Sequence, residues 1–245
     1  MKHIVNFSGG KDSTAMLLMM LEKGVPIDRV ICIDTTKEFP QMYEHIERVQ
    51  ELVTPLKIEI YKIDFDYYFS EHVKTKGKNK GSKGYGWASN RTRWCTSLKR
   101  SMSNRIVYGD GEYIPRSQKV GRVSYSGFTE YLGIAADESK RLEKNHTGRN
   151  LVYPLTEWGI TESQALQYCY YRGLDWGGLY EKFGRVSCWC CPLKRLEEYE
   201  ALRTYEPALW KEVRAMDSKT ERNFKTSYSL DQLEEKLDKR LEKMK

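Results

Sequence analysis

This sequence lacks an apolar run long enough to cross a membrane, and we expect it to lack a leader as well. No apolar run approaches the roughly 20 residues that a membrane-spanning helix needs. Residues 1–7 lead directly into a predicted strand, so we expect no signal peptide and a cytoplasmic protein without membrane contact. The G-x-x-x-x-G-K-[ST] spacing is also absent, which excludes a Walker-type phosphate loop.

The composition is that of a globular protein with a polar surface. Of the 245 residues, 40% are hydrophobic and 31% are charged, which suits one large domain or a domain with an appendage. Lysine and arginine total 41 against 34 aspartates and glutamates, a net charge of +7. This moderate excess favours polyanionic partners such as nucleotides or nucleic acid.

The stretch Ser8-Gly9-Gly10-Lys11-Asp12-Ser13-Thr14 is the strongest signal in the chain. It lies between a short predicted strand over residues 3–7 and a predicted helix over residues 12–23. A glycine pair lets the backbone turn tightly and approach a ligand. The first N–H groups of the helix then form an anion site, to which hydroxyls and one ammonium add donors. The stretch predicts a phosphate loop; the alternative is an ordinary helix start after a glycine turn.

Predicted strands and helices alternate along the first part of the chain. The strands cover residues 3–7, 29–34, 57–63 and 130–136, with a short extended piece at 151–155, and the helices cover 12–23, 40–53 and 161–172. This alternation predicts an α/β fold, an open, mostly parallel, twisted sheet with helices on both faces. Further helices over 193–204, 207–217 and 229–245 predict a helical extension at the C-terminal end.

Asp34 ends the second predicted strand, beside the phosphate loop. Ligands of open parallel sheets bind outside the carboxyl ends of the strands, where both features fall. A carboxylate there can accept a hydrogen bond from a ribose hydroxyl or help to hold Mg²⁺. Alternatively, Asp34 only caps the following helix.

Residues 74–86 form a basic, glycine-rich segment. Such a run cannot bury a core, and like-charge runs are often no more than solvated loops. Because the segment follows the third predicted strand, it could also cover a polyanionic ligand.

Three of the six cysteines stand within four residues, in Ser187-Cys188-Trp189-Cys190-Cys191-Pro192. The Cys188-x-x-Cys191 spacing is that of a metal knuckle, with two thiolates on one turn. Four thiolates would suit a [4Fe–4S] cluster or Zn²⁺, and three would suit a cluster with an open iron. Reduced structural thiols or a redox-active pair are the alternatives. We expect Cys32 and Cys169 to be core residues.

The loop Ser8–Thr14 resembles the PP-loop, S-G-G-x-D-[ST], of the ATP pyrophosphatase superfamily. With Asp34-Thr35-Thr36-Lys37-Glu38-Phe39-Pro40-Gln41-Met42-Tyr43, the chain is similar to the phosphoadenosine phosphosulfate (PAPS) reductase family of that superfamily, in particular to DndC-like and phage-type members with a late C-x-x-C-P. Thr36 replaces the usual glycine and Gln41 the usual glutamate. Residues 133–141 resemble, more loosely, the family's G-x-R-x-x-E-S-x-x-R region, with Ala135 at the first arginine position.

The resemblance implies a Rossmann-like, adenine nucleotide alpha hydrolase-like domain over residues 1–205, which includes the cysteine-rich segment, and a helical extension over 206–245. It implies ATP and Mg²⁺ as ligands. The implied catalytic residues are Lys11, Asp12, Ser13 and Arg141, whose planar guanidinium suits phosphate. The implied nucleotide contacts are Ser8, Gly9, Gly10, Lys11, Asp12, Ser13, Thr14, Asp34, Thr35, Phe39 and Gly133. Members with the late cysteine pair also have a counterpart of Trp94-Cys95-Thr96, so the implied metal ligands are Cys95, Cys188, Cys190 and Cys191.

Two departures from the family pattern bear on the reaction. The E-C-G-L-H-like catalytic segment of the PAPS reductases is missing, and the PP-loop is intact, whereas those reductases usually have a degraded one. Both departures favour cleavage of ATP to AMP and pyrophosphate, an adenylation linked to sulfur transfer. A reductase of PAPS or adenylyl sulfate and a nucleotide-dependent nucleic-acid-binding subunit are the alternatives. The corresponding partners would be a sulfur-donor protein or nucleic acid.

Overall fold

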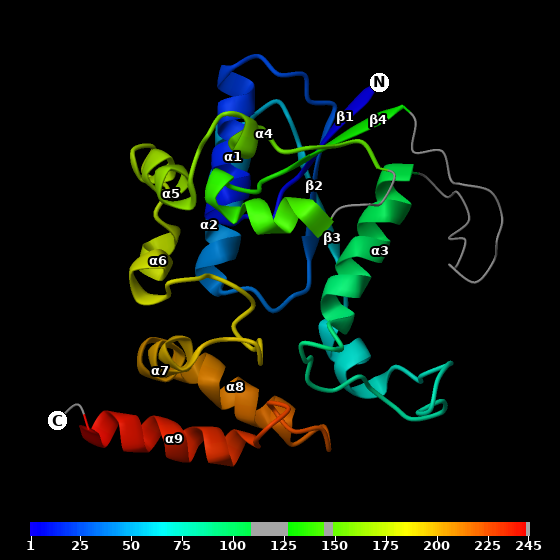
Figure 1. Ribbon diagram of the computed structural model, residues 1–245, viewed down its shortest axis with the longest axis vertical. Helices are drawn as coiled ribbons and strands as arrows, with labels where there is room; N and C mark the ends of the chain where they lie inside the picture. Colours follow the sequence, from blue (N-terminus) through cyan, green and yellow to red (C-terminus); the bar gives the residue numbers. More distant parts are fainter. Residues whose placement is uncertain (109–126, 145–148, 244–245) are drawn as a thin grey trace. The chain divides into compact units, whose positions relative to one another are not determined.

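The computed structural model describes residues 1–108, 127–144 and 149–243 (Figure 1). The chain forms two compact units that are interleaved along the sequence. Unit 1 comprises Met1–Asp34, Pro40–Lys62 and Lys99–Gly177, and unit 2 comprises Thr35–Phe39, Ile63–Leu98 and Gly178–Lys245. The boundary expected at residue 205 falls inside unit 2 and stays a prediction.

Unit 1 is built on a sheet of five parallel strands, as far as the described residues show (Figure 1). The strands are β1 (Lys2–Asn6), β2 (Arg29–Asp34), β3 (Ile58–Lys62), β4 (Phe128–Leu132) and β5 (Leu151–Val152), in the order β3-β2-β1-β4-β5. The predicted α/β class with an open parallel sheet is thereby confirmed. The strand order reverses between β1 and β4, and open sheets bind ligands outside the carboxyl ends at such a switch point.

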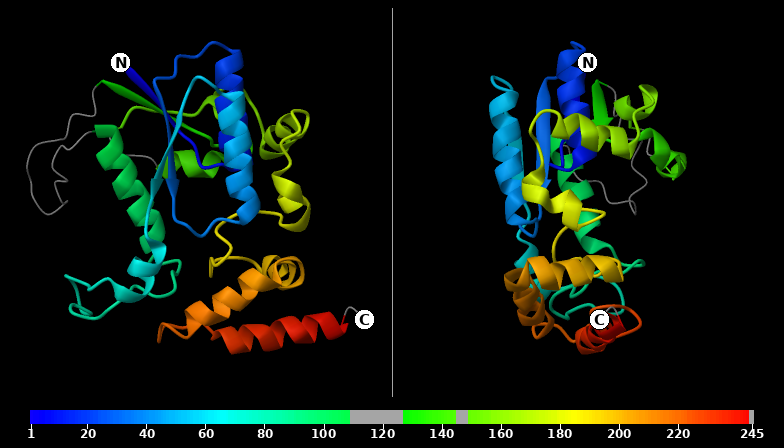
Figure 2. Two further views of the ribbon diagram at one scale, coloured as in Figure 1. Left: turned by 180° about the vertical axis from the view of Figure 1, so that it is seen from behind. Right: turned by 90° about the vertical axis from the view of Figure 1, so that its left-hand side faces the viewer.

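Helices of unit 1 cover both faces of this sheet (Figure 2). Right-handed crossovers place α1 (Lys11–Glu22) and α2 (Pro40–Leu52), which follow β1 and β2, on one face. On the other face, Val107 of α3 (Trp94–Tyr108) packs in one buried cluster with Ile4 and Ile31. The α3 helix begins in unit 2 and continues in unit 1.

Shorter helices complete unit 1. They are η2 (Ala136–Lys144), α4 (Pro154–Glu157), α5 (Glu162–Tyr170) and η3 (Trp176–Gly178), whose last residue already belongs to unit 2, and α5 packs directly on α1. The strand expected over residues 130–136 ends at Leu132, so that prediction is wrong at its C-terminal end. The reason is a turn in which the Ile134 N–H donates to the Leu132 carbonyl, after which Ala136 opens η2.

Unit 2 has an aromatic core surrounded by helices. Phe69, Trp87, Tyr199 and Phe224 are fully buried, and Phe224 packs edge-on against Trp87 at 4.8 Å between ring centres. The helices are η1 (Tyr67–Glu71, a π-helix), α6 (Leu179–Lys182), α7 (Leu196–Tyr205), α8 (Pro207–Asp217) and α9 (Leu230–Lys243). The helix expected from residue 193 begins only at Leu196, because residues 188–194 form tight turns. The last two residues of the helix expected to reach residue 245 lie outside the described part of the chain.

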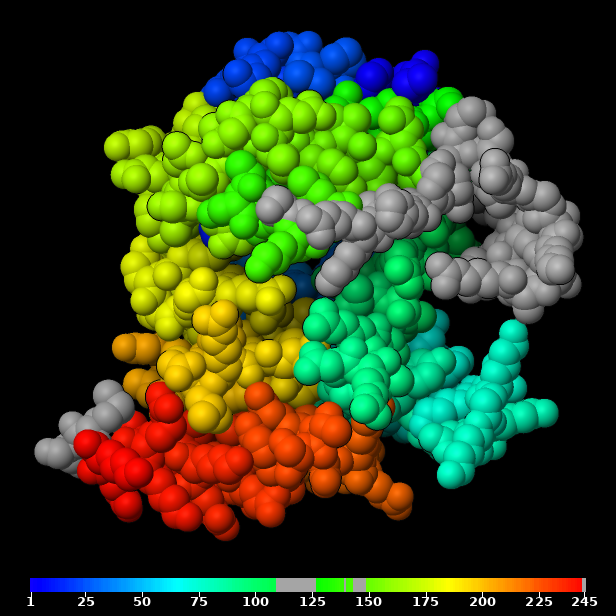
Figure 3. All heavy atoms as spheres, viewed as in Figure 1, coloured from blue at the N-terminus to red at the C-terminus, as the bar shows by residue number. Residues whose placement is uncertain are grey.

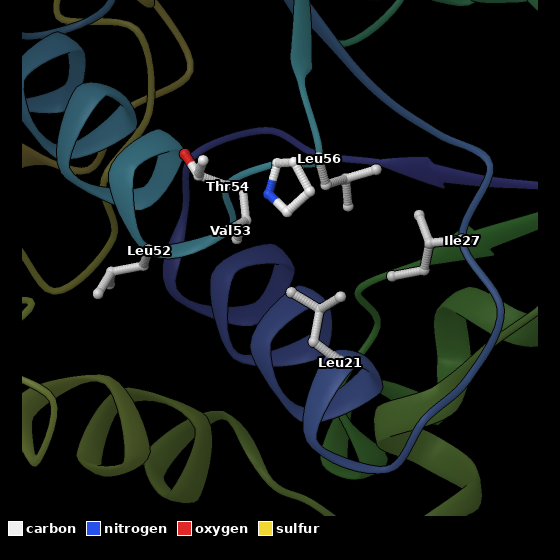
Figure 4. A pocket seen from close by; sticks show the side chains of 7 residues that line it. Leu21, Ile27, Leu52, Val53, Thr54 and Leu56 are labelled. Atoms are coloured by element: carbon white, nitrogen blue, oxygen red, sulfur yellow. The ribbon is translucent and has the colours of Figure 1, made fainter.

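An apolar pocket of unit 1 lies away from the switch point (Figure 4). Its lining comes from Leu21, Ile27 and the connection Leu52–Leu56. These residues precede β2 and β3, so the pocket lies at the amino ends of the strands, opposite the edge where the phosphate loop stands. Among the described residues, none of the helices has both the length and the apolar composition of a membrane span.

Candidate functional site

The phosphate loop connects the carboxyl end of β1 to the first turn of α1. Ser13 closes this turn on itself: its Oγ donates to the Gly10 carbonyl at 3.0 Å, accepts from the Ser8 N–H at 3.1 Å and lies 3.0 Å from the Ser8 hydroxyl. Gly10 precedes the helix with an extended backbone, and no side chain caps the helix. The first N–H groups of α1 have no acceptor within the helix, and such groups form an anion site.

Gly9 fits a space that excludes any side chain. Its φ is +76°, in the left-handed region, and an added Cβ would lie 2.9 Å from the Met42 sulfur and 3.1 Å from Ile46. Gly133, after β4, is equally constrained, since its Cβ would lie 2.8 Å from the backbone nitrogen of Ser13. Two of the predicted nucleotide contacts thus have a packing role, which brings the β4 connection against the first turn of α1.

His45 and Trp176 support the loop from inside unit 1. His45 Nε2 lies 3.0 Å from the Thr14 hydroxyl, and its ring stacks on Trp176 at 4.1 Å. The Trp176 Nε1–H donates to the Gly9 carbonyl at 2.8 Å. Burial, and then the charge of Arg48, lowers the pKa of His45 to about 3, so the imidazole is neutral. The positive φ of Trp176, +53°, is unusual for a bulky residue and is held by these contacts.

Three carboxylates meet beside the start of α1. One oxygen of each of Asp12, Glu138 and Glu162 lies within 4.8 Å of the others. Lys11 lies among them, with its ammonium 2.9 Å from Asp12 and 3.4 Å from Glu162. Burial raises the pKa of Asp12, while the Lys11 charge acts in the opposite direction. Such a set of oxygen ligands suits a hard divalent cation.

Arg141 and Asp34 complete the predicted residues of unit 1. Arg141 is exposed, and its Nη1 donates to both oxygens of Glu138 at 2.7 Å. Asp34 is buried at the end of β2 and accepts a hydrogen bond from the Tyr43 hydroxyl at 3.1 Å. Asp34 therefore stands at the carboxyl edge of the sheet. Predicted nucleotide contacts follow two strands at this edge, β1 and β2.

The residues directly after Asp34 belong to unit 2 and pack against the cysteine segment. The Thr35 hydroxyl lies 3.5 Å from the Cys188 sulfur, which is also 3.4 Å from a Glu38 oxygen. The Trp189 N–H donates to the Lys37 carbonyl at 3.0 Å. Thr36 between them has a φ of +60°, at the position where the family usually has glycine. Phe39 is fully buried against Phe183 at 4.9 Å.

Cys188, Cys190 and Cys191 lie on one tight turn in which the Cys191 N–H donates to the Cys188 carbonyl at 3.1 Å. Cys190 is buried, and burial raises the pKa of its thiol well above the ordinary value. Burial also raises the pKa of Cys191, on which the charge of Cys95 acts in the same direction. Cys95, in the first turn of α3, is thus near enough to Cys191 for an electrostatic interaction.

Cationic side chains surround this turn. Lys194 is 3% exposed, and its ammonium donates to the Ser187 hydroxyl at 3.1 Å and lies over the rings of Phe39 and Phe183. Lys37 is also buried, 2.9 Å from Asp66 and over the Trp189 ring. The ammonium groups of Lys194 and Lys37 would compensate the negative charge of thiolates, or of an anionic cluster, on the cysteines.

Among the described residues, no three cysteine sulfurs lie within 4.8 Å of one another. A [4Fe–4S] cluster and Zn²⁺ both use cysteine thiolates, so the choice between them belongs to a metal analysis of the protein. Cys32 and Cys169 are buried, as expected of core residues.

Four residues of the loop's surroundings were not predicted as site residues: His45, Trp176, Glu138 and Glu162. Glu138 stood within the recognised segment 133–141, but only the arginine was singled out. Glu162 stands at the start of the helix predicted over residues 161–172, where an acidic residue is ordinary. No local pattern points to His45 or Trp176, because their roles depend on contacts distant in sequence.

Comparisons with known proteins bear on the family. Residues 2–113 match the phosphoadenosine phosphosulfate reductase domain. An uncharacterized protein of Methanocaldococcus jannaschii is 25% identical over 211 residues, which cover 84% of this chain but only 39% of that protein. The U34-tRNA thiolase NcsA from Methanococcus maripaludis, solved with its [4Fe-4S] cluster, is 14% identical with a TM-score of 0.41, over 89% of this chain and 71% of that one. The resemblance expected from the loop 8–14 and residues 34–43 is confirmed, since both stretches lie within the residues that match the phosphoadenosine phosphosulfate reductase domain.

Proposed function

We propose that the protein cleaves ATP between its α- and β-phosphates, releasing pyrophosphate and transferring AMP to an acceptor as a step of sulfur transfer. The observation that carries this proposal is the intact loop 8–14 at the switch point of the sheet, with Asp12, Glu138 and Glu162 beside it. The family match supports an enzyme of nucleotide and sulfur chemistry.

In this proposal the first turn of α1 holds the leaving pyrophosphate. Backbone N–H groups, the hydroxyls of Ser8 and Ser13 and the ammonium of Lys11 donate to oxygens whose negative charge increases as the bond breaks. Because Gly9 and Gly133 fix the backbone on both sides, these donors are already oriented before ATP binds, and reorienting them costs little.

Two further groups follow from the same geometry. Asp12, Glu138 and Glu162 would hold Mg²⁺, which supplies charge neutralisation on the phosphates when bound. Asp34, oriented by Tyr43, would accept from the ribose hydroxyls, and Arg141 would leave Glu138 to contact a phosphate. Cys95, Cys188, Cys190 and Cys191 would hold a [4Fe–4S] cluster or carry sulfur themselves, with Lys194 and Lys37 compensating the negative charge.

The reaction is tested with ATP labelled in turn at the α- and γ-phosphates, with Mg²⁺ and candidate acceptors. We expect AMP and pyrophosphate. Lys11→Gln should lower the rate by about 100-fold, the cost of removing one oriented donor. Lys23→Gln, an exposed position at the other end of α1, should leave the rate unchanged. ADP and phosphate as the sole products would refute the proposal.

The family match also favours a second candidate, a reductase of PAPS or adenylyl sulfate. Its thiol would come from Cys95 or the turn 188–191. Thioredoxin-dependent release of sulfite from either nucleotide would support this activity, and no release from both would exclude it.

A further inference from the structure

A basic surface of unit 2 has no role in the ATP chemistry proposed above. Residues 72–95 contain five lysines and two arginines, and no aspartate or glutamate. We propose that the basic aromatic face, defined as Tyr67, Tyr68, His72, residues 74–83, Tyr85, Arg91 and Arg93, binds single-stranded nucleic acid. This inference is independent of the proposed function.

The lysines stand on an ordered hairpin rather than on a featureless loop. The Lys74 N–H donates to the Ser82 carbonyl at 3.0 Å, the Gly81 N–H donates to the Lys74 carbonyl at 2.8 Å, and Val73 bridges Lys83. Figure 3 shows this segment, in turquoise, projecting from the surface. Lys76, Lys78 and Lys80 are exposed, and none of them forms an ion pair with a described carboxylate. Their charge is therefore available to phosphates.

Aromatic rings stand at the base of the hairpin. Tyr68 and Tyr85 are nearly parallel, with ring centres 6.5 Å apart, and His72 lies 5.1 Å from each. Tyr67 is 46% exposed and meets Tyr68 edge-on at 5.2 Å. Tyr67 and Tyr68 come from the π-helix η1, a rare kind of element that is frequent at functional sites. Tyr68, His72 and Tyr85 are half-buried, so Tyr67 offers the most accessible ring. Aromatic rings beside lysines are the combination on which unpaired bases stack.

Arg222 stabilises the loop that contributes the two arginines of this face, Arg91 and Arg93. Its guanidinium donates to the Thr92 hydroxyl at 2.6 Å, the Ser89 hydroxyl at 3.1 Å and the Tyr85 carbonyl at 3.4 Å. These bonds fix the loop that carries the exposed Arg91 and Arg93. Because its acceptors here are uncharged, Arg222 also adds positive charge to the face. The loop of Arg91 and Arg93 is thus tied to the backbone of Tyr85, one of the rings of this face.

Stacking of bases on the tyrosine rings distinguishes single-stranded nucleic acid from a duplex. The bases of a duplex are already stacked on one another, so they cannot lie on the tyrosines without unpairing. A single strand can offer its phosphates to the lysines and its bases to the rings together. We therefore expect preference for single strands over a duplex of equal length.

The test measures fluorescence anisotropy of labelled RNA, single-stranded DNA and duplex DNA with the full chain between about 50 and 200 mM salt. The triple variant Lys76→Gln/Lys78→Gln/Lys80→Gln should bind single strands at least tenfold more weakly. The slope of log affinity against log salt should fall by about 2, since each lost phosphate contact removes about 0.7. Tyr67→Ala should cost about tenfold in affinity, with the melting temperature within the range of the control variant.

The matched control removes the same charge from exposed lysines of α8 and α9 in unit 2, as Lys211→Gln/Lys239→Gln/Lys243→Gln. We expect it to bind like the unmodified protein. Equal losses in both triple variants, no binding by the unmodified chain at the lowest salt, or tighter binding of duplex than of single strands would each overturn the proposal. RNA and single-stranded DNA are separate arms, so a difference between them assigns a role to the 2′-hydroxyl.

Discussion

At the scale of single residues, the phosphate loop depends on Gly9 for two reasons that can be separated. Gly9 and Gly24 both have left-handed φ values, +76° and +64°, but a Cβ at Gly24 would meet nothing within 4 Å. Gly24→Ala should therefore cost only the conformational strain, about 1 kcal/mol. Gly9→Ala adds the contact with Met42 and should cost about 2–3 kcal/mol of unfolding free energy.

Urea unfolding of the two variants and calorimetric titration with ATP check this prediction. Gly9→Ala should also weaken ATP binding, because the loop backbone must shift, whereas Gly24→Ala should bind ATP normally. Equal effects of the two substitutions on stability and on ATP binding would contradict the close packing at Gly9.

His45 makes the stability of the fold depend on pH. Its pKa falls from 6.5 to about 3 on folding, because it is buried. Below pH 6.5 the unfolded chain takes up the proton and the folded chain does not. The contribution of His45 is thus unaffected above pH 6.5 and falls by about 1.4 kcal/mol per pH unit down to about pH 3.

Urea unfolding at several pH values between about 7 and 5 measures this slope. His45→Gln should reduce this slope by the share of about one proton. Unchanged slopes in His45→Gln would mean that the histidine is charged in the folded protein.

At the scale of elements, the carboxylate cluster depends on where three helices begin. Asp12 stands in the first turn of α1, Glu138 in η2 and Glu162 at the start of α5. The position of Glu162 is fixed by a capping box, in which the Thr161 hydroxyl accepts from the Gln164 N–H and the Gln164 side chain accepts from the Thr161 N–H.

Glu162→Gln should raise the Mg²⁺ concentration required for half-maximal ATP cleavage by about tenfold, because one anionic ligand is lost. Glu157→Gln, at an exposed position in α4, should leave that requirement unchanged. A magnesium titration of the initial rate measures both. If the requirement is the same in all three proteins, Glu162 does not hold the metal.

The elements were predictable where one local signal dominates. The strand at 29–34 and the helix at 40–53 follow from apolar runs and proline, and the capping box of α5 from Thr161 and Gln164. The end of β4 could not be predicted in this way. Gly133 leaves the strand and lies against α1, and no local pattern in the sequence encodes that contact. For the same reason Glu162 was interpreted as part of a helix start and not as a partner of Asp12.

At the scale of the whole molecule, the metal content of the purified protein tests whether the cysteines bind an iron–sulfur cluster. Anaerobic purification should give a brown protein with absorbance near about 400 nm, iron and sulfide. Cys188→Ser and Cys191→Ser should lose the colour, and Cys169→Ser, at a buried position of unit 1, should keep it. Colourless protein with zinc would contradict a cluster, and protein with neither metal would contradict ligation.

The sequence predicted the parallel sheet but not the interleaving of two compact units. The family resemblance implied one domain over residues 1–205, and that boundary stays a prediction. The short segment Thr35–Phe39 belongs to unit 2, where Phe39 packs on Phe183 and Thr35 lies beside Cys188. Such a division depends on aromatic contacts between segments more than 100 residues apart, which spacing in the sequence does not reveal.

Because the two units are interleaved along the sequence, dividing the chain at one position does not separate them. The chain passes from one unit to the other after Asp34, Phe39, Lys62, Leu98 and Gly177. A split gene that ends its first half at Gly177 would make Phe39, Phe69 and Trp87 in one polypeptide, and Phe183 and Phe224 in the other. Unit 2 would then form only when the two polypeptides associate. Folding of unit 2 would therefore show that both polypeptides are present.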